Sequence, residues 1–294
     1  MPDPIVWIDG HEVAAESASI SIFDRGLLYG DGCFEVLRTW DGKLVEREAH
    51  LLRLAETAAY LQLRWRGVDA VRTAVQSALR SARTSRGDGA RSDAPDHRVR
   101  IVLTRGPGAL SVPMREAGPG REIVIVEEIA PESDAARGAV QAMRLATVDF
   151  DLPRRPGRGH KTLAYLDHVI AKELAREAGA DDAIRCSADG HVAEGGTFNL
   201  FVVDGEYVRT PHVDQGVLPG IVRARVLRIC ERLGLPTNVG PIPRLVLAGA
   251  TEVFATSSIR GVVPVVSIDA RALSSGEVTQ KVARTFVEEM LAGG

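Results

Sequence analysis

The stretch Gly159–Val203 reads GHKTLAYLDHVIAKELAREAGADDAIRCSADGHVAEGGTFNLFVV and decides how its half of the chain folds. Lys161 stands at the head of a segment with helical periodicity, which we predict to stop before Gly179. An Asp-Gly pair between two apolar runs follows and predicts a hairpin, with Glu194 on a strand just before a Gly-Gly-Thr turn. We therefore expect a helix that begins at Lys161 and a hairpin that presents Glu194.

The same signals recur along the chain and predict an α+β fold. Asp-Gly pairs between strand-like runs predict four hairpin turns, at Asp9-Gly10, Asp41-Gly42, Asp189-Gly190 and Asp204-Gly205. Apolar residues at helical spacing predict five helices, whose stripes begin at Leu51, Val68, Leu163, Val222 and Val278. The stripe of the third helix consists of Leu163, Leu166, Ile170 and Leu174, which lie on one face. Strands in pairs and helices in blocks favour α+β over a doubly wound parallel sheet.

The chain is long enough for two domains. Residues 131–138 read PESDAARG, a proline followed by small and charged residues between two strand-like runs, which is typical of a linker. We predict a small N-terminal sheet-and-helix domain over 1–130, the linker at 131–138, and a larger C-terminal domain, which would bind a cofactor, over 139–294.

Composition excludes several classes of protein. A formal charge of −3 lacks the excess of basic residues that nucleic-acid binding requires. The sequence contains neither a signal-peptide pattern nor an apolar run of membrane-spanning length, so we expect a cytoplasmic protein without a membrane partner. Three scattered cysteines fit three reduced, buried thiols, and scattered histidines give no metal-site pattern.

The residues can supply the three groups that a pyridoxal phosphate site requires, which are a lysine, an acid and an anion socket. Lys161 is the candidate for the bond to the cofactor, and Glu194 could keep the pyridine nitrogen protonated. The N-terminus of the helix after Pro219-Gly220 could bind the phosphate through the N–H groups of Ile221 and Val222. Further donors could come from Arg53, Ser257 and Ser258.

Several motifs together resemble the class IV aminotransferases, the fold-type IV group of pyridoxal phosphate enzymes. They are WIDG, DRGLLYGDGCFEVLRTWDGKL, HLLRL, HKTLAYLDHVIAKELA, DGHVAEGGTFNLFVV, VLPGIVR and EVFATSS, spread from Trp7 to Ala270. The resemblance implies a PLP-dependent transaminase with a barrel-like sheet in the C-terminal domain. It also implies a homodimer that acts on amino acids and keto acids.

The resemblance also assigns roles to residues of the cofactor site. It implies that Lys161 is the Schiff-base lysine, that Glu194 is the acid beside the pyridine nitrogen, and that Arg53 is the phosphate-binding arginine. The phosphate loop falls on Ile221 and Val222 with a hydroxyl from Ser258 and its neighbour Ser257. Tyr165 matches a tyrosine that contacts the phenolic oxygen of the cofactor in branched-chain members.

Substrate choice rests on the first half of the chain. The YGDGCFEV stretch is more similar to the D-amino acid aminotransferases, and we predict exchange between a D-amino acid such as D-alanine and 2-oxoglutarate. The alternatives are a branched-chain L-amino acid aminotransferase, favoured by Tyr165 and LPGI, and an aminodeoxychorismate lyase, disfavoured because Val36 stands where the resemblance expects a threonine. The Pro-Arg-x-His carboxylate grip of the known D-enzymes is missing after Thr104.

Another cation must therefore bind the substrate carboxylate if the substrate is a D-amino acid. Arg38 is the first candidate because strand periodicity places it on one face with Phe34 and Val36. The other candidate substrate-binding residues are Arg25, Arg105 and Ile259. The Gly/Pro-rich loop at 105–121 is a candidate lid.

Overall fold

The computed structural model describes residues 3–84, 95–109, 113, 116–130, 142–148, 159–187, 189–274 and 276–293. The chain forms two compact units. The first comprises described residues within Met1–Glu132 together with His160–Tyr165, and the second comprises described residues within Ser133–Gly159 and Leu166–Ala292. The predicted linker at 131–138 lies outside the described residues.

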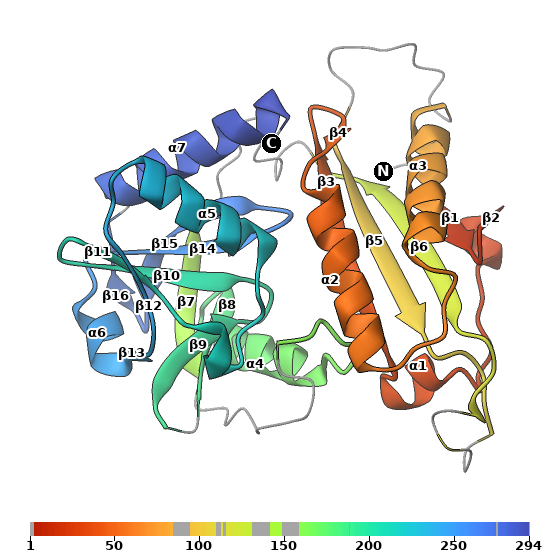
Figure 1. Ribbon diagram of the computed structural model, residues 1–294. Helices are drawn as coiled ribbons and strands as arrows, with labels where there is room; N and C mark the ends of the chain where they lie inside the picture. The colour runs from red at the N-terminus through yellow and green to blue at the C-terminus, as the bar shows by residue number, and fades with distance from the viewer. Residues whose placement is uncertain are drawn as a thin grey trace. The chain divides into compact units, whose positions relative to one another are not determined.

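The first unit is a sheet with two long helices (Figure 1). Its elements are β1 (Ile5–Ile8), β2 (His11–Val13), the short helix η1 (Ala15–Ser17), α1 (Arg25–Tyr29), β3 (Gly32–Trp40), β4 (Lys43–Leu44), α2 (Arg47–Tyr60), α3 (Val68–Thr84), β5 (His97–Thr104) and β6 (Arg121–Glu128). The strand order is β2-β1-β6-β5-β3-β4, and every pairing is antiparallel. This arrangement leaves β3 near one edge of the sheet.

The core of the first unit lies between the sheet and the helices α2 and α3, which cover one face. Cys33 and Leu37 of β3 pack there against Leu51 and Leu54 of α2 and Val75 of α3. Residues two apart on a strand point to the same face, so Glu35, which lies between Cys33 and Leu37, also faces α2. The predicted helices with stripes from Leu51 and Val68 are thus confirmed.

The second unit is built on a long, strongly curved mixed sheet (Figure 1). Its elements are β7 (Met143–Val148), α4 (Leu166–Glu177), β8 (Asp182–Cys186), β9 (His191–Gly195), β10 (Asn199–Asp204), β11 (Tyr207–Thr210), the short helix η5 (Val213–Gln215), α5 (Ile221–Arg232), β12 (Thr237–Val239), β13 (Ile242–Pro243), α6 (Arg244–Gly249), β14 (Glu252–Ser257), β15 (Gly261–Ile268), β16 (Arg271–Ala272) and α7 (Glu277–Ala292). The strand order is β12-β11-β10-β14-β15-β7-β8-β9-β13, with β16 paired to β15. Helices α5 and α7 pack on this sheet together, and the predicted α+β, barrel-like architecture is confirmed.

The segment His160–Tyr165 is the main departure from the sequence-based expectation. It packs with the first unit, although the sequence placed it inside the C-terminal domain. Thr162 forms a β-bridge with Cys33, and the His160 ring stacks on Tyr60 with centroids 4.1 Å apart. Lys161 therefore lies on an extended segment, and the prediction that it begins a helix is wrong, since α4 starts at Leu166.

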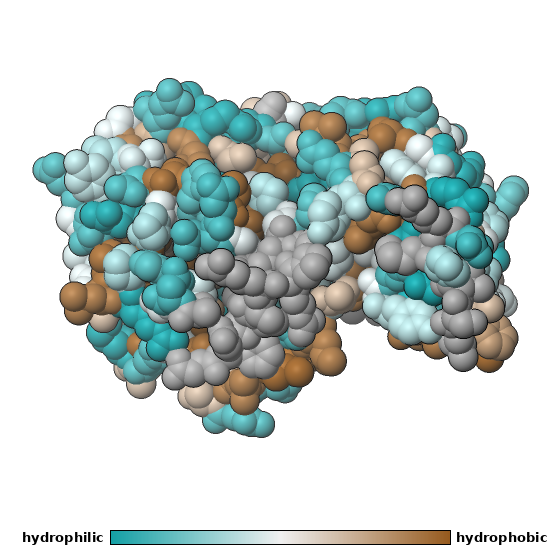
Figure 2. Space-filling model, turned by 60° about the horizontal axis from the view of Figure 1, so that its bottom comes forward, coloured by the Kyte–Doolittle hydropathy of each residue, from teal (hydrophilic) through white to brown (hydrophobic). Residues whose placement is uncertain are grey.

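The apolar stripe of α4 is largely exposed. The helix is buried through Ala171 and Ala175, because small side chains let it lie close to the strands β7 and β8. The larger apolar residues of the helix are exposed: Leu166 by 67%, Val169 by 50%, Ile170 by 39% and Leu174 by 40%. Figure 2 shows apolar surface, in brown, among hydrophilic surface on the face of the molecule that it presents.

The Asp-Gly turns form the expected hairpins, with one difference in backbone conformation. Asp9-Gly10 and Asp41-Gly42 have positive φ at both residues, as the two-residue turn requires. In the other two pairs only Gly190 and Gly205 do. All three cysteines are buried and free, as expected. Within the described residues, no helix is both long and apolar enough to cross a membrane.

Candidate active site

Lys161 is held in the first unit by main-chain pairing to β3. The Phe34 N–H donates to the Lys161 carbonyl at 3.0 Å, and the Leu163 N–H donates to the Gly32 carbonyl at 2.9 Å. The amine of Lys161 lies 4.4 Å from the centroid of the Phe34 ring and 5.9 Å from that of Tyr165. The structure therefore brings together three of the predicted residues, Lys161, Phe34 and Tyr165.

The aromatic rings beside Lys161 also order each other. Phe34 and Tyr165 meet edge to face, with centroids 5.4 Å apart and planes at 83°. Such a contact is a preferred geometry of aromatic pairs and adds to the stability gained by burying the rings. As a result, the two rings restrict the positions open to the Lys161 side chain.

Arg100 joins this group, and sequence reasoning missed it. Arg100 is paired with Val36 in the register of β5 on β3, so both point to the face that carries Phe34. Its guanidinium carbon lies 4.4 Å from the centroid of the Phe34 ring. Burial lowers the pKa of Arg100, while Tyr165 and Glu127 raise it. The alternation of HRVRIVLT, with Arg98 and Arg100 on one face, was the signal that could have found it.

Arg53, the predicted phosphate ligand, is engaged in a buried ion pair. Its Nε and Nη2 donate to the two carboxylate oxygens of Glu35 at 2.6 and 2.8 Å. His50 Nδ1 lies 2.8 Å from the same carboxylate. Burial would raise the pKa of Glu35, but Arg53 and His50 together lower it to about 2. The site therefore holds a fully ionised carboxylate, and phosphate binding by Arg53 stays a prediction.

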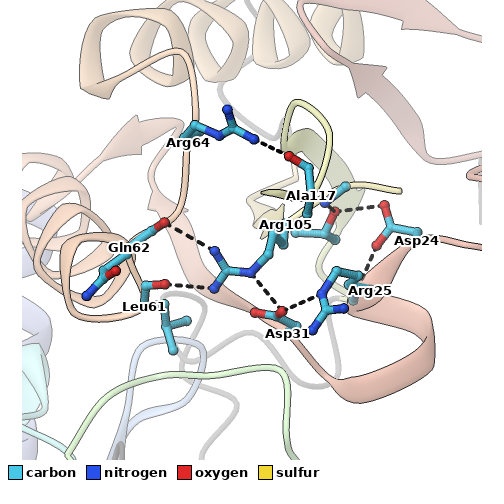
Figure 3. Close-up of polar contacts among 11 residues, drawn as sticks. Asp24, Arg25, Asp31, Leu61, Gln62, Arg64, Arg105 and Ala117 are labelled. Atoms are coloured by element: carbon cyan, nitrogen blue, oxygen red, sulfur yellow. Dashed lines mark hydrogen bonds and ion pairs between the residues drawn. The ribbon is translucent and has the colours of Figure 1, made fainter. Parts of the chain in front are cut away.

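Two of the candidate substrate arginines share one aspartate (Figure 3). The Nε atoms of Arg25 and Arg105 donate to Asp31 Oδ2 at 3.0 and 2.7 Å. Arg105 also donates to the carbonyl oxygens of Gln62 and Leu61, at 3.2 and 2.7 Å. These contacts connect α1, the end of α2 and the loop after β5, so both guanidinium groups already share an anionic partner.

Arg38, the first candidate for binding the substrate carboxylate, contacts other residues of the first unit. Its Nη2 forms an ion pair with Asp96 at 3.1 Å, its Nε donates to the Thr39 carbonyl at 2.8 Å, and its guanidinium lies 4.1 Å from the centroid of the Trp40 ring. The side chain is 1% exposed. Strand alternation predicted the face of Arg38, but its long side chain reaches the end of the strand instead of the middle of that face.

Glu194 lies in the second unit, in a network of hydrogen-bond donors. Its Oε1 accepts from Arg185 Nη2 at 3.2 Å. Its Oε2 accepts from Asn199 Nδ2 at 3.2 Å and from the Leu218 N–H at 3.0 Å. An ionised carboxylate only accepts hydrogen bonds, so these donors suit the anionic form that a pyridinium nitrogen needs beside it.

The same network leads to the predicted phosphate socket. Asn199 also donates to the Leu218 carbonyl at 2.9 Å, just before the start of α5. The helix begins after Gly220, which caps it without a side chain, and a Cβ atom there would collide with Asn199 Oδ1. Main-chain N–H groups at such a helix start attract anions.

The remaining predicted residues lie at the end of β14 and directly after it. Asn199 pairs with Thr256 in the register of β10 on β14, so Ser257 and Ser258 come directly after that pair. Ser257 Oγ accepts from the Arg260 N–H at 3.3 Å. Ile259, like Ile221 and Val222, is partly exposed. The second unit thus gathers the acid, the start of α5 and the hydroxyl-bearing turn.

The donor set fits pyridoxal phosphate. A lysine amine lies against aromatic rings, an acid accepts hydrogen bonds from three donors, and the start of α5 is uncapped by any side chain. These features are the ones that a pyridoxal phosphate-dependent enzyme requires.

Comparison with known proteins identifies the family. The model of the class IV amino-transferases matches residues 32–268. The chain belongs to this family, is a pyridoxal phosphate-dependent transaminase, and acts on amino acids and keto acids.

Curated relatives carry three different activities in their names. A protein of Methanocaldococcus jannaschii, provisionally named as a branched-chain-amino-acid aminotransferase, is 32% identical over 96% of this chain and 94% of its own. D-alanine aminotransferase of Bacillus licheniformis is 29% identical over 92% and 90%. Aminodeoxychorismate lyase of Bacillus subtilis is 25% identical over 97% and 94%.

Solved structures agree over the whole chain. A fold IV transaminase from Curtobacterium pusillum has a TM-score of 0.84 at 28% identity and covers 99% of both chains. The branched-chain aminotransferase of Thermoproteus uzoniensis, solved with norvaline, has a TM-score of 0.83 at 28% identity and covers 98% of this chain and 95% of that one. Another branched-chain aminotransferase, solved with N-(5'-phosphopyridoxyl)-L-glutamate, has a TM-score of 0.85 at 27% identity and covers 99% and 95%. These likenesses agree with the fold and with the cofactor.

Proposed function

We propose that the protein moves an amino group between a D-amino acid, such as D-alanine, and 2-oxoglutarate, with Arg100 binding a substrate carboxylate. The position of Arg100 carries the carboxylate part of this proposal. Its guanidinium lies over the Phe34 ring, as the Lys161 amine also does. Within the described residues Arg100 forms no ion pair. A half-buried guanidinium in this position is suited to a carboxylate partner.

The residues of the chain divide the work in this proposal. When bound, pyridoxal phosphate supplies an electron sink that stabilises negative charge at the α-carbon of the substrate. Lys161 holds the cofactor and moves a proton at that carbon, and Tyr165 contacts the phenolic oxygen of the cofactor. Glu194 keeps the ring nitrogen protonated. The phosphate is bound by Arg53, by the N–H groups of Ile221 and Val222, and by the hydroxyls of Ser257 and Ser258.

A branched-chain L-amino acid substrate is the second candidate. Two observations favour it: the M. jannaschii relative, which is 32% identical, and the position of Tyr165 against Phe34 beside Lys161. Arg100 is compatible with this candidate too, because 2-oxoglutarate would be the amino acceptor in both. The D-amino acid proposal rests on the YGDGCFEV motif, which runs into the start of β3.

An aminodeoxychorismate lyase is supported by one relative but has less support from the residues. Val36 stands where the resemblance expects a catalytic threonine, and its side chain has no hydroxyl to move a proton. We therefore rank this activity third.

Half-reactions with single amino acids separate the three candidates. The holoenzyme is mixed with D-alanine or L-leucine, the spectrum of the bound cofactor is followed, and 2-oxoglutarate is then added. We expect D-alanine to convert the cofactor and D-glutamate to form. L-glutamate from L-leucine would replace our proposal with the branched-chain activity. Pyruvate released from aminodeoxychorismate without a keto acid would establish the lyase.

We also propose a homodimer in the cytoplasm. The exposed stripe of α4 supports the homodimer, because apolar side chains of this size gain stability when a partner covers them. Sedimentation of the wild type and of Ile170→Glu tests it. We expect a dimer that Ile170→Glu weakens, while Glu173→Gln, an exposed change on the same helix, has no effect. A monomeric wild type at micromolar concentration would refute it.

A further inference from the structure

Arg185 is a charged residue in a fully buried strand. It lies on β8 between Ile184 and Cys186, both of which are buried, and its own side chain is 4% exposed. Burying a guanidinium is costly unless a charged partner compensates for the lost hydration. The contact that provides this compensation is the hydrogen bond from Nη2 to Glu194 Oε1 at 3.2 Å.

A second guanidinium acts on the same carboxylate from another element. Arg223, in the first turn of α5, donates to Thr210 Oγ1 at 3.2 Å and to the Pro211 carbonyl at 2.8 Å. Burial lowers the pKa of Arg223 and the Glu194 charge raises it. The acid therefore lies in the field of two buried cations, one bonded to it and one at longer range.

Two other ionisable groups close to this part of the sheet contact residues other than Glu194. His191, on the strand of Glu194, pairs with Asp189 at 3.2 Å. Arg244, on α6, directs its Nε to Cys186 Sγ at 3.3 Å. Arg185 is thus a buried charged residue that donates a hydrogen bond to Glu194.

We propose that Arg185 is a positioning residue that sets the protonation of the cofactor ring through Glu194. Arg185 holds the Glu194 carboxylate in place as an anion. Its positive charge offsets part of the negative charge of Glu194 that acts on the ring nitrogen. The ring nitrogen then binds its proton less tightly than it would beside a carboxylate with no such partner. This inference rests on the proposed pairing of Glu194 with the ring, and is independent of which amino acid is the substrate.

The test is a pH titration of the holoenzyme loaded with ¹⁵N-labelled pyridoxal phosphate, followed by the chemical shift of the ring nitrogen. Removing a nearby positive charge favours proton uptake, so Arg185→Met is expected to raise the midpoint by about 1 to 2 pH units. Arg185→Lys keeps the charge and should titrate close to the wild type. An unchanged or lowered midpoint in Arg185→Met would overturn the proposal.

Two controls keep the result interpretable. Arg144→Met removes the same charge from an exposed side chain of β7 that is paired with Asp181, and it should leave the midpoint unchanged. If Arg185→Met does not fold, Arg185→Gln, which can still donate a hydrogen bond, replaces it with the same expected upward shift.

A double-mutant cycle separates failure of this inference from failure of the site assignment. In a Glu194→Gln background, Arg185→Met should cause a much smaller shift, because its effect is transmitted through the carboxylate. A full shift in that background would mean that Arg185 acts without Glu194 and would refute the proposal. If Glu194→Gln alone left the titration unchanged, the pairing of Glu194 with the ring would fail, and the present inference with it, while the transaminase activity would stand.

Discussion

The main-chain N–H of Phe34 donates a hydrogen bond to the carbonyl oxygen of Lys161 at 3.0 Å. This bond attaches the candidate catalytic lysine to β3, in the first unit, although the segments that flank it in sequence do not belong there. Main-chain pairing leaves less freedom than a loop would, and the Lys161 amine accordingly lies over the Phe34 ring of the same pair.

Lys161 should be the point of covalent attachment of the cofactor. After reduction with borohydride, intact mass spectrometry should show bound cofactor on the wild type and none on Lys161→Ala, and turnover should fall by about 10³-fold or more. Lys43→Ala, an exposed lysine at the end of β4, is the matched control and should behave like the wild type. Cofactor still attached to Lys161→Ala would remove Lys161 from this role.

Arg100 should control the use of 2-oxoglutarate. Arg100→Met removes a charge-assisted contact to a carboxylate, so we expect the KM for 2-oxoglutarate to rise by about 10- to 100-fold with a smaller change in kcat. Arg98→Met is the matched control, because Arg98 is an arginine on the same strand and the same face. The guanidinium of Arg98 is half exposed and lies 3.8 Å from Glu127. Equal kinetic effects of the two variants would contradict a carboxylate-binding role for Arg100.

The Glu35–Arg53 pair should contribute strongly to stability. Glu35→Gln leaves a buried arginine without its charge partner, and such losses cost about 3 to 5 kcal/mol. Chemical denaturation measures the difference, and Glu48→Gln, which removes an exposed ion pair to Arg72, should cost less than about 1 kcal/mol. A Glu35→Gln variant as stable as Glu48→Gln would show that the buried pair is energetically neutral.

Acid should destabilise the protein partly through Glu35. The pKa of Glu35 is about 2 in the folded state against an ordinary value of 4.5, so between these values the unfolded chain binds the additional proton. Its contribution is therefore complete above about pH 4.5 and is lost as the pH falls towards 2. The full contribution is about 3 kcal/mol. The free energy of unfolding, measured from pH 5 to pH 2.5, should fall less steeply in Glu35→Gln than in the wild type.

The sequence by itself predicted most of the described elements and the family, and it supplied the residues that we propose for the cofactor site. Local patterns were sufficient for this, since the alternation in β3, the stripes of α2 and α3 and the Asp-Gly turns depend on neighbouring residues. The ordered motifs from Trp7 to Ala270 predicted a class IV aminotransferase, which the family comparison confirmed.

Only the tertiary structure decided where the long side chains end and which faces are covered. Arg38, Arg25 and Arg105 are directed to aspartates, Arg100 lies over Phe34, and Arg185 donates to Glu194, because contacts between residues distant in sequence set their positions. The stripe of α4 is exposed because two alanines allow the closer contact with the sheet. Lys161 joins β3 through main-chain hydrogen bonds, which any sequence can make and which no pattern of side chains therefore predicts.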